Sequence, residues 1–86
     1  MIGDINQRKD MTKTEVLFAL KRGTHWLLKH QKNVYLNPGH IKVQYMTFRK
    51  LLRNGDIRET HYSKYEDFYI YRHREYKSYI EKVANA

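Results

Sequence analysis

The sequence contains no cysteine in its 86 residues. This absence excludes a disulfide framework and a thiolate metal site, which are the usual supports of small secreted domains. No apolar run approaches the roughly 18 residues that a membrane-spanning helix needs, and residues 1–11 lack the apolar segment of a signal peptide. We therefore expect a cytoplasmic protein with a flexible tail over residues 1–11 and a single basic domain over residues 12–86.

Acidic residues are missing from a long central stretch, residues 16–55. The formal net charge of +8 lies entirely there, because each flank carries as many acids as bases. Such segregation is typical of a surface that attracts polyanions, although a solvated basic face without a partner is the alternative. The bases of this stretch are Lys21, Arg22, Lys29, Lys32, Lys42, Arg49, Lys50 and Arg53.

The first element is a helix whose end has two interpretations. The segment from Thr12 to Glu15 has the form of a capping box, which predicts that a helix starts here. Apolar residues at helical spacing extend this helix to about His30. Gly23 favours a helix that ends at Arg22 and a strand that follows over residues 24–30, because glycine is common just past a helix end.

The segment Asn37-Pro38-Gly39 also has two interpretations. A turn here would pair strands 33–36 and 40–45 as a hairpin. We favour a helix over residues 38–54 that starts with Pro38 and ends before Gly55. An apolar stripe at helical spacing supports this helix and predicts its core residues: Ile41, Tyr45, Phe48 and Leu52.

After Gly55 the apolar period changes to 2, which predicts a hairpin of strands 57–62 and 67–72. Phe68 and Ile70 are expected to face inward, and Tyr69 and Tyr71 outward. A last helix is expected from about His73 to Val83. The predicted fold class is α+β, a small single domain of about three helices with an antiparallel β-hairpin.

Residues 18–23 and 50–55 are weakly similar, because each segment combines apolar residues with bases and ends in glycine. They lie 32 residues apart. If both glycines end helices, the chain is a duplicated helix-plus-hairpin unit.

Opposite its apolar stripe, the predicted helix 38–54 carries a row of cations that leads through Gly55 into the hairpin. This order resembles the recognition helix and wing of winged-helix DNA-binding domains over residues 38–72, in topology and pattern. The resemblance implies that the helix and the hairpin contact nucleic acid. The candidate binding residues are Lys42, Arg49, Lys50, Arg53, Arg58, Tyr69, Tyr71 and Arg72.

Eight tyrosines, several of them interleaved with bases, have two further uses. Outward-facing Tyr69 and Tyr71 would stack on unpaired bases. Tyrosine is equally suited to a protein interface, where it combines rigid apolar area with a polar tip.

No motif indicates catalysis or metal binding. The five histidines lack metal-ligand spacing, and the sequence has neither a glycine-rich phosphate loop nor a nucleophile elbow. We expect no enzyme activity and no cofactor.

The leading expectation is a small regulatory protein that binds nucleic acid, with duplex favoured. The first alternative is an inhibitor or adaptor of phage or mobile-element type that blocks an acidic host protein. The second is an RNA-binding component of a larger assembly. No membrane partner is expected, and a homodimer is compatible with the sequence.

Overall fold

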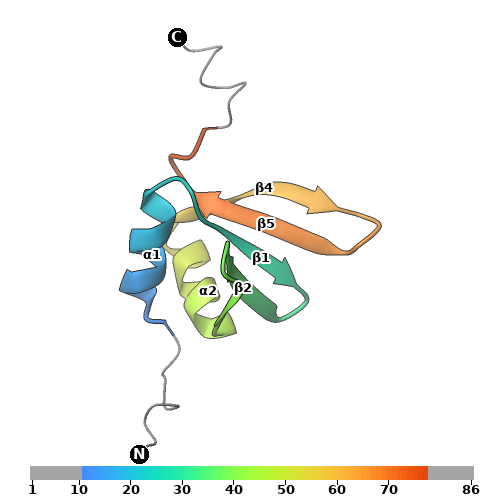
Figure 1. Cartoon of the computed structure of the whole chain (residues 1–86), viewed down its shortest axis with the longest axis horizontal. Helices are drawn as coiled ribbons and strands as arrows, with labels where there is room; N and C mark the ends of the chain where they lie inside the picture. Colours follow the sequence, from blue (N-terminus) through green and yellow to red (C-terminus); the bar gives the residue numbers. More distant parts are fainter. Residues whose placement is uncertain (1–10, 78–86) are drawn as a thin grey trace, which may run out of the picture.

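The computed structural model describes residues 11–77, which form a small α+β domain. Five strands make one antiparallel sheet in the order β3-β2-β1-β5-β4. Two helices pack against each other and against one face of this sheet (Figure 1). The elements are α1 (Lys13–Lys21), β1 (Trp26–His30), β2 (Asn33–Asn37), β3 (Ile41–Val43), α2 (Tyr45–Arg53), β4 (Ile57–Ser63) and β5 (Phe68–His73).

The start of α1 is the predicted capping box. The Thr12 backbone N–H donates to Oε1 of Glu15 over 2.8 Å, and the Glu15 backbone N–H donates to Oγ1 of Thr12 over 3.1 Å. The helix ends at Lys21, and Gly23 follows with a φ of +82°, in the region that glycine adopts most easily. The shorter helix followed by a strand is therefore correct, and the extension to His30 does not form.

The favoured helix over residues 38–54 is wrong at its N-terminal end. Residues 38–40 form a turn, and β2 and β3 pair as the hairpin that was the alternative, with Val34 opposite Val43. The turn is closed because the His40 backbone N–H donates to Oδ1 of Asn37 over 3.1 Å. Helix α2 begins only at Tyr45.

This late start changes which residues of α2 are buried. Phe48 is in the core as predicted, but its partner is Leu51, which is 0% exposed, whereas Leu52 is 40% exposed. Ile41, which lies on β3, no longer belongs to the helical stripe. The prediction that Leu52 is a core residue is therefore wrong by one position.

The predicted hairpin after Gly55 is confirmed as β4 and β5, but its inward and outward faces are reversed. Tyr71 pairs with Leu27 of β1 and points to the helices, where its ring meets the Phe48 ring edge-on with centroids 4.8 Å apart. Ile70 lies one position and Phe68 three positions from Tyr71 on the strand, so both occupy the opposite face.

The predicted third helix does not begin at His73, because His73 is the last residue of β5 and residues 74–77 are a turn and irregular chain. The rest of that prediction, residues 78–83, lies outside the described residues. No helix within residues 11–77 is long and apolar enough to cross a membrane.

The order of elements contains a repeat. Each helix is followed by a glycine with positive φ, Gly23 at +82° and Gly55 at +77°, and then by an antiparallel hairpin. The hairpins β2-β1 and β5-β4 lie side by side in the sheet, and β3 is added at one edge. A helix followed by a hairpin thus occurs twice in the order of the elements, with β3 as a third strand in the first half. The duplication that the similar segments suggested stays a prediction.

Candidate nucleic-acid interface: the open face of the sheet

The register of the sheet separates two faces. Two rows of paired residues, one through Leu27 and one through Val34, supply most of the sheet's part of the core and point to the helices. Ile57 adds to the core from the start of β4. The row between them points the other way, because neighbouring positions of a strand face opposite sides. We call this second side, which neither helix covers, the open face (Figure 1).

One residue from each strand forms a row straight across the open face. Leu28 and Ile70, both half-buried, are paired at its centre, so the middle of the row is apolar. From β3 to β4 the row is Lys42, Tyr35, Leu28, Ile70 and His61. With strands about 4.8 Å apart, the row is roughly 19 Å long.

Beside this row, the Arg72 side chain lies between two aromatic rings. Its guanidinium carbon is 5.6 Å from the centroid of the Trp26 ring and 4.5 Å from that of the Tyr76 ring. Arg58 is paired with Arg72 across the strands. Its side chain donates to the backbone carbonyl of Arg74 over 3.2 Å and also to the backbone carbonyl of Tyr76. Arg58 thereby fixes the turn that holds Tyr76 against Arg72.

A second stack lies at the β2–β3 side of the open face. The exposed His40 ring is parallel to the Tyr35 ring, with centroids 4.0 Å apart and planes 10° apart. The Lys42 amine is 5.3 Å from the centroid of the same tyrosine and donates to Oδ1 of Asn33 over 3.1 Å. Tyr35 thus has an aromatic partner and a cationic partner within the protein itself.

Among the strand residues that form it, the open face carries charge of one sign. Lys42, Arg58 and Arg72 are its cations, and Glu59 lies on the helix side because it pairs with buried Tyr71. The residues that the strand pairing and its alternation place on the open face include no carboxylate: Trp26, Leu28, His30, Asn33, Tyr35, Asn37, Lys42, Arg58, His61, Ser63, Phe68, Ile70 and Arg72.

The candidate binding residues chosen from the sequence are divided between different parts of the molecule. Lys42, Arg58 and Arg72 lie on the open face. Tyr71 is buried under the helices, and half-buried Tyr69 lies on the same side of β5, where the Lys29 amine is 5.0 Å from the centroid of its ring. The remaining three, Arg49, Lys50 and Arg53, are exposed on α2.

These three cations point away from the sheet. On α2 the buried residues are Phe48 and Leu51, and the exposed Met46 lies on the opposite side of the helix with the cations. Lys21 and Arg22 at the end of α1 are also exposed. We call Lys21, Arg22, Met46, Arg49, Lys50 and Arg53 the helix face; it lies on the other side of the molecule from the open face.

Sequence reasoning missed the aromatic residues that the structure gathers on the open face: Trp26, Tyr35, Phe68 and Tyr76. The available signal was the alternation of Trp26, Leu28 and His30 in residues 24–30. It is visible only if Gly23 is taken as the end of the helix, because a helix through this segment hides a period of 2.

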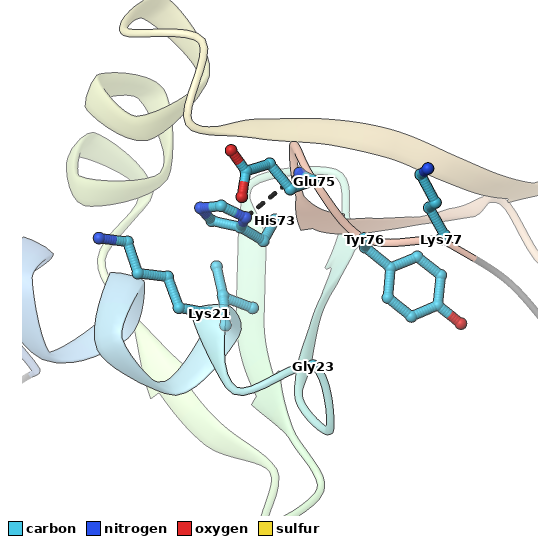
Figure 2. Close-up of a pocket in the computed structure, with 7 residues that line it drawn as sticks. Lys21, Gly23, His73, Glu75, Tyr76 and Lys77 are labelled. Atoms are coloured by element: carbon cyan, nitrogen blue, oxygen red, sulfur yellow. Dashed lines mark hydrogen bonds between the residues drawn. The ribbon is translucent and has the colours of Figure 1, made fainter. Parts of the chain in front are cut away.

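A cavity of about 500 Å³ lies at the end of the molecule where α1 and β5 finish. The buried His73 ring accepts a hydrogen bond at Nδ1 from the Glu75 backbone N–H over 3.2 Å. Tyr76 and Lys77, which also line the cavity, point away from the His73 ring (Figure 2). Lys21 and Glu75 place opposite charges around the cavity. His73 therefore joins β5 to the turn after it, and the mixed lining does not share the single charge sign of the open face.

Compared with protein-family models, with curated proteins and with solved structures, the chain matches none of them.

Proposed function

We propose that this protein binds single-stranded nucleic acid on the open face of its sheet. The observation that carries the proposal concerns residues 11–77. On the sheet face that neither helix covers, they combine aromatic rings and cations without a carboxylate. Aromatic rings and guanidinium planes stack on unpaired bases, and cations neutralise the backbone between them.

Two features favour a single strand over a duplex as the ligand of this face. The exposed ring of His40, stacked on Tyr35, and the half-buried rings of Trp26 and Tyr76 beside Arg72 are surfaces for stacking. A duplex has no unpaired base to offer them. The apolar centre of Leu28 and Ile70 likewise fits the faces of bases better than a row of phosphates.

The test removes two rings from the open face without changing the charge. For Tyr35→Ser/Phe68→Ser, we expect the affinity for a single-stranded oligonucleotide of about 12 residues to fall roughly 5- to 150-fold per stacked base lost. Fluorescence anisotropy of the labelled oligonucleotide measures this affinity, and the affinities for RNA and DNA oligonucleotides are compared. Circular dichroism and a thermal melt establish that the variant is folded.

The matched control is Tyr62→Ser/Tyr65→Ser, which removes two rings that are 45% and 98% exposed on the helix side and at the tip of the β4–β5 hairpin. It should bind within about threefold of wild type. Equal losses in both variants, or an unchanged affinity in the first, would contradict the proposal. If the protein binds an acidic protein and has negligible affinity for nucleic acid, the result would instead support the alternative function as an inhibitor of a host protein.

A second candidate is duplex binding by α2 and the hairpin that follows it, as in a winged helix. The observation that favours it is the exposure of Arg49, Lys50 and Arg53 on one side of α2. Cations on a helix position a protein on phosphates. In this arrangement the hairpin is part of the five-stranded sheet, so the helix carries the contact.

A further inference from the structure

Two sets of cations lie on opposite sides of this small domain. The open face carries Lys42, Arg58 and Arg72 beside its aromatic rings. The helix face carries Lys21, Arg22, Arg49, Lys50 and Arg53. The sheet and its helices lie between the two sets (Figure 1), so one continuous ligand on the open face does not cover the other side.

The two sides have different chemistry. On the open face, aromatic rings provide stacking and neighbouring cations provide charge. The helix face contains the exposed Met46 and borders the exposed Phe18, since the Arg22 guanidinium carbon is 5.9 Å from the centroid of the Phe18 ring. The flexible cations around them fit phosphates, which carry no sequence information.

The helix face carries more cations than stabilisation of the helix dipoles explains. Lys21, Lys50 and Arg53 lie in the last turns of their helices, where a cation stabilises the helix dipole. Arg49 lies a turn earlier on the same side of α2, and its guanidinium carbon is 5.9 Å from the centroid of the Tyr45 ring. A cluster of this size on one side of the helix layer is suited to binding a polyanion.

We infer that the helix face is a second nucleic-acid site, which binds the phosphates of another segment while a single strand occupies the open face. One protein molecule then bridges two segments. This inference rests on the proposed function of the open face, and it adds that the partner of the helix face is a phosphate backbone, single- or double-stranded.

The experiment measures bridging directly. Two non-complementary single-stranded oligonucleotides carry a donor and an acceptor fluorophore, and energy transfer is followed as full-length protein is added. Bridging predicts transfer that rises and then falls when protein is in excess, because each strand then occupies its own protein molecule. Sedimentation of the protein alone shows whether a dimer is present.

The decisive variant is Arg49→Gln/Lys50→Gln/Arg53→Gln. We expect it to lose most of the energy transfer and to keep the wild-type anisotropy affinity for one strand within about threefold. A control that removes two charges, Lys13→Gln/Lys64→Gln, changes exposed bases at the start of α1 and in the β4–β5 turn and should bridge like wild type.

The outcomes separate the two proposals. If wild type binds no single strand, the proposed function fails. If wild type binds single strands and the α2 variant bridges as well as wild type does, only the inference fails. Equal loss of bridging in both charge variants would also overturn it, because net charge would then explain the effect.

Discussion

At the scale of single residues, Tyr71 is both the largest departure from the sequence-based expectation and a titratable group of the core. On β5, Phe68 and Ile70 alternate with Tyr69 and Tyr71. Because phenylalanine and isoleucine are the more hydrophobic residues, the sequence favoured Phe68 and Ile70 as the buried pair. Pairing with Leu27 decides the face instead, and this contact between distant segments is not visible in the local sequence. Tyr71 thus packs on Phe48, and the more apolar residues take the open face.

The position of Tyr71 predicts how stability depends on pH. Burial raises the pKa of Tyr71 above 10.0, and the Glu59 carboxylate opposite it on β4 acts in the same direction. The folded state therefore holds the phenol proton more tightly than the unfolded state, so its contribution is complete below pH 10 and is lost as the pH rises above it. Tyr71→Phe keeps the ring and removes this titration.

Urea unfolding of both proteins between about pH 9 and about pH 11.5 tests this expectation. The free energy of unfolding of wild type should fall more steeply with pH than that of Tyr71→Phe. Parallel curves would show that the phenol of Tyr71 titrates alike in the folded and unfolded states.

At the scale of elements, the sequence predicted those whose signals are local. The capping box at Thr12 fixed the start of α1, and the change of period after Gly55 fixed the β4–β5 hairpin. The prediction of strands β1 to β3 depended on how Gly23 and Asn37-Pro38-Gly39 were interpreted. At both places the local signals allowed either a helix or a strand. The wrong choice at the second site placed the start of α2 seven residues too early, at 38 instead of Tyr45.

The register of α2 supplies a sharp test of this element, because two adjacent leucines exchange roles between the predicted and observed helix. Leu51→Ala should lower the free energy of unfolding by about 2 to 5 kcal/mol, since Leu51 is fully buried. Leu52→Ala should cost roughly 0.5 kcal/mol, since much of that side chain is exposed. Urea titration of both variants measures the difference, and a larger loss for Leu52→Ala would contradict the observed packing.

At the scale of the whole molecule, the basic stretch of the sequence does not form a single basic helix. The bases of residues 16–55 are distributed over both sides of the domain, because Lys42 lies on β3 and Arg49, Lys50 and Arg53 lie on α2. Arg58 and Arg72, from the neutral C-terminal flank, complete the open face. The composition indicated a polyanion as partner. The division of the cations between two faces could be recognised only from the order of the strands in the sheet.

The central claim, that single strands stack on the open face, can be tested most directly with Trp26. It is the one tryptophan of the chain, it lies on that face, and the guanidinium carbon of Arg72 is 5.6 Å from the centroid of its ring. Its emission and the anisotropy of a labelled single-stranded oligonucleotide are recorded in the same titration. We predict that the two signals change together with one Kd, and that Arg49→Gln/Lys50→Gln/Arg53→Gln leaves the Trp26 change intact. Saturation of the anisotropy without any change in Trp26 emission would contradict the account, because the strand would then bind away from the open face.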